Sequence, residues 1–175
     1  TASFNSYGFL IMANSNNNTL EKNIIMKNSF GIYIDDFSYS NIVKGNLIQD
    51  NFIGSNIVSN SNDNIFFDNY FANPQNVYDK NNVNAWNTTK QVRTNILGGS
   101  CLAGNFWDDY NGTDLDGDGI GDTELPYNSR GNISNGGDYL PLAIPKGIKI
   151  ISPKGEEIFV TNSTILIDFE GINVD

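Results

Sequence analysis

A repeat of 23 residues constrains this chain more than any other feature of its sequence. Gly8, Gly31 and Gly54 lie 23 residues apart. The same interval separates two sets of asparagines, Asn18, Asn41 and Asn64, and Asn23, Asn46 and Asn69. Apolar residues keep the register in three columns: Ile11, Ile34 and Ile57; Leu20, Val43 and Phe66; Ile25, Ile48 and Phe71. Self-similarity at a fixed period is the signature of a protein built from stacked repeats.

The apolar pieces within each repeat are short and rich in β-branched and aromatic residues, as in residues 8–12 and 31–34. Such pieces read as strands of three to five residues separated by turns. Helical repeats are longer than about 30 residues, and the leucine-rich repeat signature is absent. We therefore predict an all-β parallel β-helix of about 23 residues per coil, in which coils stack roughly 4.8 Å apart.

The chain is polar through amides rather than ions, with 29 Asn but only 17% charged residues. A β-helix explains this composition, because stacked Asn side chains form ladders and Asn tolerates the left-handed backbone of sharp corners. A disordered, prion-like segment is the alternative, which the apolar register disfavours. We expect a fourth, degraded coil ending near Trp86 or Asn87. In the coil before it, Ser55 interrupts the apolar column of Phe9 and Ile32.

The negative charge is concentrated in one segment. The net charge is -10, and residues 101–145 contribute -7 of it, with eight acids against Arg130. An acidic chain without a basic run lacks a nucleic-acid-binding footprint. The absence of His excludes a Ser-His-Asp triad and His-ligated zinc or copper. The single Cys101 excludes an internal disulfide, and no apolar run reaches membrane-spanning length.

Within this segment, residues 114–122 match the first nine positions of a calcium loop. The predicted ligands are the side chains of Asp114, Asp116, Asp118 and Asp122 and the carbonyl of Ile120. The loop lacks the closing Glu and the flanking helices of an EF-hand. We therefore predict a structural calcium site completed by Asp108, Asp109 or Asp138, with a solvated acidic turn as the alternative.

The closing segment of a β-helix family resembles three stretches of this chain: residues 104–110, the Asp-Gly loop at 114–122, and residues 137–142. That family is named for a periplasmic accessory protein of copper insertion into nitrous oxide reductase, and it is abundant in archaeal surface proteins, especially of methanogens. The resemblance covers about residues 5–144. It implies a right-handed parallel β-helix, export from the cell, and kinship with modules that bind or cleave carbohydrate. No His, one Cys and two Met leave no credible copper ligand set.

Three segments are expected along the chain. Residues 1–87 form the β-helix coils, 88–145 form an irregular calcium-binding cap, and 146–175 begin an immunoglobulin-like module or form a β-hairpin. In the last segment, residues 147–153 and 163–169 read as strands. The chain starts and stops within patterns, so we expect it to be part of a longer protein.

We expect a non-catalytic extracellular or cell-surface module with a structural or adhesive role, whose partners are surface glycans or neighbouring copies. Asp35, Asp36, Asp63 and Asp68 have no acidic partner in their 23-residue columns, which disfavours catalysis. The alternative is a carbohydrate-binding or carbohydrate-active β-helix, with Trp86, Trp107, Tyr110 and Tyr127 as sugar-stacking candidates. Five glycosylation sequons agree with export, at Asn17, Asn87, Asn111, Asn132 and Asn162.

Overall fold

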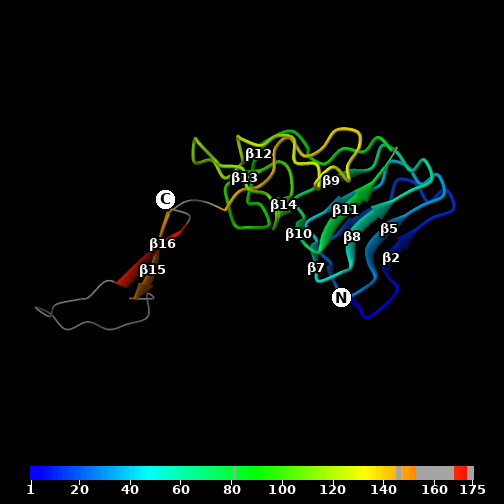
Figure 1. Ribbon diagram of the computed structural model, residues 1–175, viewed down its shortest axis with the longest axis horizontal. Helices are drawn as coiled ribbons and strands as arrows, with labels where there is room; N and C mark the ends of the chain where they lie inside the picture. The colour runs from blue at the N-terminus through cyan, green and yellow to red at the C-terminus, as the bar shows by residue number, and fades with distance from the viewer. Residues whose placement is uncertain (81, 145–146, 153–167, 173–175) are drawn as a thin grey trace, which may run out of the picture. The chain divides into compact units, whose positions relative to one another are not determined.

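The computed structural model describes residues 1–80, 82–144, 147–152 and 168–172, and these residues form strands and turns without a helix (Figure 1). Three parallel sheets build the first part of the chain. The largest contains β1 (Ala2–Ser3), β4 (Ile24–Met26), β7 (Leu47–Gln49), β10 (Tyr70–Ala72) and β14 (Phe106–Trp107). The second contains β2 (Tyr7–Ile11), β5 (Phe30–Ile34), β8 (Ile53–Ile57) and β11 (Gln75–Asp79). The third contains β3 (Thr19–Glu21), β6 (Ile42–Lys44) and β9 (Ile65–Phe67).

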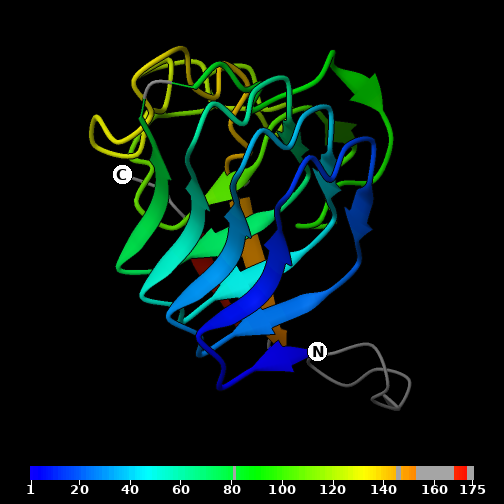
Figure 2. The ribbon, with the colours of Figure 1, turned by 90° about the vertical axis from the view of Figure 1, so that its right-hand side faces the viewer.

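The strands pair in the predicted register. Ile11 pairs with Ile34 and Ile34 with Ile57, each step being 23 residues. Each of the first three coils contributes one strand to each sheet, so neighbouring strands come from successive coils and run parallel (Figure 2). The prediction of a parallel β-helix is therefore confirmed.

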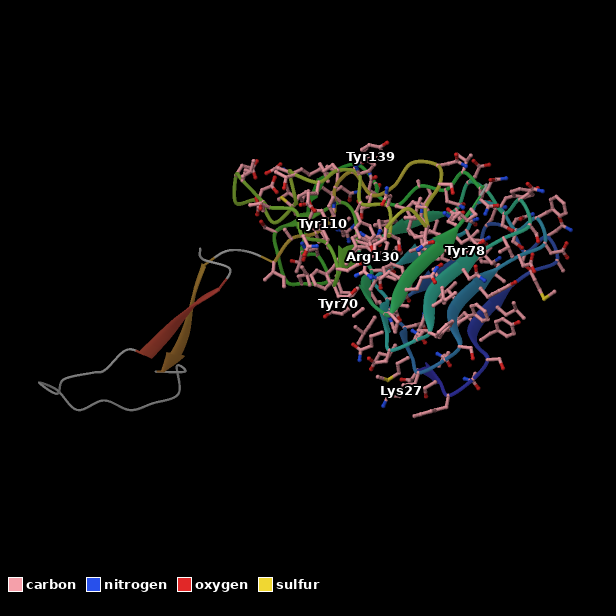
Figure 3. All side chains as sticks on the ribbon, in the orientation of Figure 1. Lys27, Tyr70, Tyr78, Tyr110, Arg130 and Tyr139 are labelled. Atoms are coloured by element: carbon pink, nitrogen blue, oxygen red, sulfur yellow. The ribbon has the colours of Figure 1, made fainter. Side chains whose placement is uncertain are left out.

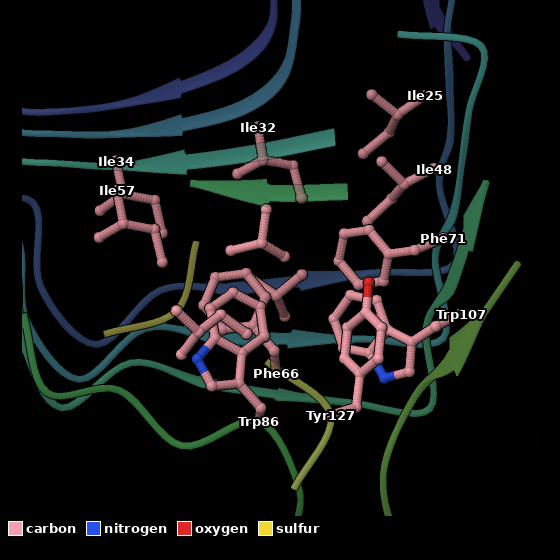
Figure 4. Packing of buried hydrophobic residues seen from close by; sticks show 13 residues of the cluster. Ile25, Ile32, Ile34, Ile48, Ile57, Phe66, Phe71, Trp86, Trp107 and Tyr127 are labelled. Carbon is pink, nitrogen blue, oxygen red and sulfur yellow. The ribbon is translucent and has the colours of Figure 1, made fainter. Parts of the chain in front are cut away.

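The apolar columns form the interior. Ile25, Ile48, Phe71 and Trp107 lie one above another in the largest sheet, each no more than 1% exposed (Figure 4). The column grows from aliphatic to aromatic toward the later coils. There Phe71 stacks on Trp107 with ring centroids 4.5 Å apart, and Phe66 stacks on Trp86 at 4.4 Å. These large rings fill the interior where the coils end.

The asparagines form three ladders, and each rung is a side-chain bond. Asn46 Nδ2 donates to Asn69 Oδ1 at 2.9 Å, and Asn28 Nδ2 donates to Asn51 Oδ1 at 2.9 Å. We expected the ladder Asn residues themselves to have the left-handed backbone. Positive φ values instead occur at the residue just before each ladder Asn. Lys22, Gly45 and Asp68 have φ of 55°, 63° and 57°. Corner geometry and ladder bonding, which we assigned to the same Asn, are thus divided between adjacent residues.

The fourth coil departs from the 23-residue period. Ser55 pairs with Val77 and Ile57 with Asp79, a step of 22 residues. The corner residue that precedes Asn51 has no counterpart before Asn73, which accounts for the shorter step. The largest sheet then receives β14 rather than a strand near Trp86. The intervening residues form a hairpin of β12 (Gln91–Val92) and β13 (Cys101–Leu102).

The chain divides into two compact units, Thr1–Ala143 and Ile144–Asp175. In the second unit, β15 (Gly147–Ser152) and β16 (Asp168–Ile172) form an antiparallel pair. The first of these strands agrees with the strand expected over 147–153. Most of the one expected over 163–169 lies outside the described residues, and the immunoglobulin-like module remains a prediction.

Replacing Ser55 by valine is expected to stabilise the protein by about 1–2 kcal/mol. Ser55 is fully buried, its Oγ has no hydrogen-bond partner among the described residues, and its strand neighbours are Ile32 and Val77. Valine removes an unpaired hydroxyl and completes the apolar column. Ser38→Val is the matched control: Ser38 is equally buried, but its Oγ accepts the Ser15 N–H, so this variant should be destabilised. Urea unfolding measures both, and destabilisation by Ser55→Val would contradict the expectation.

Candidate functional site: the acidic segment after the coils

The predicted metal loop brings some of its carboxylates together. Ligand oxygens of Asp114, Asp116 and Asp122 lie within 4.8 Å of one another. The loop's own backbone already bonds these carboxylates. Gly117 N–H donates to Asp114 Oδ1 at 2.7 Å, Gly119 N–H to Asp114 Oδ2 at 2.8 Å, and Leu115 N–H to Asp122 Oδ2 at 2.7 Å. The closely spaced Asp side chains therefore stabilise the turn of the loop by accepting hydrogen bonds from its backbone N–H groups.

The other two predicted ligands have different surroundings. Asp118 forms an ion pair with Lys90 and also accepts the Ile120 N–H at 2.8 Å. The Ile120 side chain is 3% exposed and belongs to a small apolar cluster with Cys101 and Ala103. This loop is anchored by packing and by one ion pair.

Acids terminate the Asn ladders, and they include Asp108, Asp109 and Asp138, which we expected to complete the metal site. Asn76 Nδ2, at the end of one ladder, donates to Asp108 Oδ1 at 2.8 Å and to Asp109 Oδ1 at 2.9 Å. Asn84 Nδ2, at the end of another, donates to Asp79 Oδ2 at 3.0 Å. Each Asn in a ladder donates to the next member of that ladder, so the last amide needs an acceptor. A carboxylate, which only accepts, meets that need.

Asp138 terminates the third ladder and is the most enclosed of these acids, at 0% exposure. Its Oδ2 accepts the Asn105 N–H at 2.7 Å and the Trp107 Nε1–H at 2.9 Å, and its Oδ1 accepts the Leu140 N–H at 3.0 Å. Burial raises the pKa of Asp138 to about 7, and the three donors oppose this rise. Burial likewise raises the pKa of Asp79. Sequence reasoning did not find either of these ladder-ending roles.

Three of the predicted sugar-stacking aromatics, Trp86, Trp107 and Tyr127, are buried. Trp86 and Trp107 are 0% and 1% exposed and lie within the core, so neither ring offers a face to a ligand. Tyr110 is half-buried; its hydroxyl donates to the Thr123 carbonyl at 2.5 Å, and its ring packs edge-on against Tyr127. The signal for a packing role was present, because Asn105-Phe106-Trp107 repeats the Asn-apolar-apolar order of Asn69-Tyr70-Phe71.

The sequons differ in accessibility. Asn17 and Asn111 are exposed, Asn87 and Asn132 are half-buried, and Asn162 lies outside the described residues. Asn87 also accepts the Tyr139 N–H. Glycosylation at these sites remains a prediction.

One comparison with known proteins identifies a family. A family model described as periplasmic copper-binding protein (NosD) matches residues 1–112. No curated protein and no solved structure matches the chain. The matched region spans the β-helix coils, the hairpin and the start of the acidic segment.

The prediction of calcium as the cofactor is wrong. The matching family is described as copper-binding, so the metal that the family implies is copper. The Asp cluster is not evidence for calcium, because exposed acidic groups commonly gather without an ion, and loop N–H groups bond the Asp114 and Asp122 carboxylates.

This chain's own residues do not fit copper either. Copper in proteins is bound by imidazole, thiolate and thioether groups, and the chain has no His, one Cys and two Met. Cys101 is buried among Ala103 and Ile120. Met12 is exposed just after β2, whereas Met26 lies on β4 in a different sheet. These residues do not assemble a copper site, and no function proposed below depends on one.

The family is periplasmic by its description, which agrees with the predicted export. Among the described residues, no helix is long and apolar enough to cross a membrane. The family model covers well over half of the chain, and the coils that it matches are those of the observed β-helix. The chain therefore belongs to the NosD family of periplasmic β-helix proteins.

Proposed function

We propose that this chain is a non-catalytic, exported β-helix module with a structural or adhesive role. The archaeal cell surface, where the resembling proteins are abundant, is part of this proposal, as are surface glycans or neighbouring copies as partners. Attachment at a surface calls for a stable framework, and the parallel coils and Asn ladders are consistent with one.

The roles taken by the acids of the coils carry this proposal. Asp36, Asp63 and Asp68 occupy corner positions with φ between 53° and 58°. Asp35 accepts the Asp36 N–H at 2.6 Å. Glycoside hydrolysis uses two carboxyl groups facing one bond. Turn and corner positions account for these residues, which favours a scaffold over a hydrolase.

The role is tested by incubating the purified chain with cell envelopes from the organism that encodes it. We expect the chain to sediment with the envelopes and to release no reducing sugar from their polysaccharides. Folded chain centrifuged without envelopes is the control and should remain in the supernatant. Release of reducing sugar, or failure of the folded chain to sediment, would contradict the proposal.

Carbohydrate binding is a second candidate, favoured by an aromatic cluster on the outer face of the sheet β2–β5–β8–β11. Tyr7 stacks on Phe30 at 5.5 Å, and Tyr33 meets both rings edge-on at 5.1 and 5.2 Å. Tyr33 points outward, because Ile32 and Ile34 beside it are fully buried. Tyr78 lies on the same face and is partly exposed (Figure 3).

Replacing Tyr33 by alanine is expected to weaken binding to neutral glycans about tenfold, because stacking on this ring is worth about 1 kcal/mol or more. A glycan array followed by titration of the best ligand measures the change. Tyr139→Ala, which removes an exposed aromatic outside this sheet, is the control. An array with no signal would exclude this candidate.

A further inference from the structure

A cavity of about 220 Å³ lies between the third sheet and the β12–β13 hairpin. Glu21, Lys44 and Phe67 occupy equivalent positions on β3, β6 and β9. They point outward, since Val43 and Phe66 beside them are fully buried. The hairpin contributes Gln91, Arg93 and Leu102. We call the cavity lined by these residues, Lys22, Gly45 and Asp68 the basic cleft.

Hydrogen bonds hold the hairpin wall of the basic cleft in place. Asp68 joins the hairpin to β9, because its N–H donates to the Gly104 carbonyl and its Oδ1 accepts the Ile96 N–H, both at 2.7 Å. Within the hairpin loop, Asn95 donates to the Cys101 carbonyl at 2.7 Å and accepts the Gly99 N–H at 2.9 Å. The two walls are therefore preorganised, which lowers the entropic cost of binding a ligand.

Positive charge gathers in the basic cleft although the chain is acidic. Residues 1–144 contain seven Lys and Arg, and Lys22, Lys44 and Arg93 all line this one cavity. Lys44 pairs with Glu21 at 3.0 Å. Over the described part of the chain, neither Lys22 nor Arg93 lies within ion-pair distance of a carboxylate. Lys22 also keeps a left-handed φ of 55°, where the next coil has Gly45.

We propose that the basic cleft binds a uronic acid, a sugar ring that carries one carboxylate. The three cations and the acids Glu21 and Asp68 give the lining a net charge of +1, which matches a monoanion better than a phosphate dianion. Lys22 and Arg93 supply donors for the carboxylate. Glu21 and Gln91 accept from sugar hydroxyls, and Phe67 offers an apolar face to the ring. The volume is below that of a drug-sized pocket and suits one such ring.

This proposal names a ligand class for the carbohydrate-binding candidate and rests on it, but it uses a different sheet from the Tyr33 cluster. The test is titration of the ¹⁵N-labelled full chain with sodium glucuronate, with glucose and inorganic phosphate in separate arms. We expect saturable shifts of the amides of Lys22, Gly45 and Arg93 with glucuronate. Lys22→Gln and Arg93→Gln should each weaken binding about tenfold, whereas Lys22→Arg should retain it.

Lys27→Gln is the matched control. Lys27 is also an exposed corner lysine with a φ of 57°, but it does not line the basic cleft, so its replacement should leave glucuronate binding unchanged. Three results would overturn the proposal: no shifts at the cleft amides, phosphate binding as tightly as glucuronate, or equal losses in the Lys27 and Lys22 variants. Failure of Tyr33→Ala to change neutral-glycan binding would count against the aromatic cluster alone.

Discussion

Replacing Asn46 by aspartate is expected to lower the free energy of unfolding by about 4 kcal/mol at neutral pH. Asn46 is fully buried, and its Nδ2 donates to the carbonyls of Leu20 and Lys44 and to Asn69 Oδ1. Aspartate has almost the same shape but offers no donor when ionised. Three acceptors would then face a buried carboxylate. Urea unfolding followed by tryptophan fluorescence measures the loss, because Trp86 and Trp107 lie in the core.

Asn23→Asp is the matched control for this experiment. Asn23 precedes Asn46 in the same ladder but is only half-buried, and it donates to two acceptors, the Glu21 carbonyl and Asn46 Oδ1. Water can solvate a carboxylate there, so the loss should be clearly smaller. Lowering the pH should partly rescue Asn46→Asp, because a protonated carboxyl regains one donor. Equal losses at both positions would refute the view that burial of a ladder donor determines how much it stabilises this fold.

Wild-type stability is expected to fall as the pH rises from about 4 to about 8, and Asp138 is the main cause. Burial raises the pKa of Asp138 to about 7, from an ordinary value of 3.8. Its contribution to stability is therefore fully present below about pH 4 and lost as the pH rises through 7. One pKa unit corresponds to about 1.4 kcal/mol, so the full change is about 4 kcal/mol. The raised pKa values of Asp68 and Asp79 act in the same direction.

Asp138→Asn should remove most of this pH dependence, because an amide does not titrate. The stability of the variant should be nearly constant between pH 4 and pH 8, as measured by urea unfolding across the range. Asp50→Asn, at an exposed corner, is the control and should retain the wild-type slope. If the stability of Asp138→Asn still falls with pH as steeply as that of wild type, groups other than Asp138 cause the pH dependence.

The regular coils were predictable because most of their columns repeat at one fixed interval. Ile11, Ile34 and Ile57 pair as the 23-residue interval requires. A stacked repeat places each residue over its counterpart, so a one-dimensional period is enough to specify contacts. The apolar interior and the Asn rungs of the first three coils follow from that period.

The end of the β-helix was not predictable in the same way, because the spacing changes there. The rung from Asn69 reaches Asn105, 36 residues on, and the rung from Asn64 reaches Asn84, 20 residues on. A search at a fixed interval misses both partners. The acidic loop has an ambiguous pattern for another reason. Its Asp spacing is typical of cation binding, yet the same spacing lets the carboxylates accept the N–H groups of their own turn.

The unequal sequence separations between ladder partners show that the β-helix tolerates inserted residues. The rung between Asn69 and Asn105 has the same 2.9 Å length as that between Asn46 and Asn69, although the first connection is 36 residues long and the second 23. The extra residues include the β12–β13 hairpin, which adds a wall to the surface without breaking the ladder. Since closing a longer loop costs little extra free energy, new binding loops could be inserted ahead of other ladder positions while the coils keep their order.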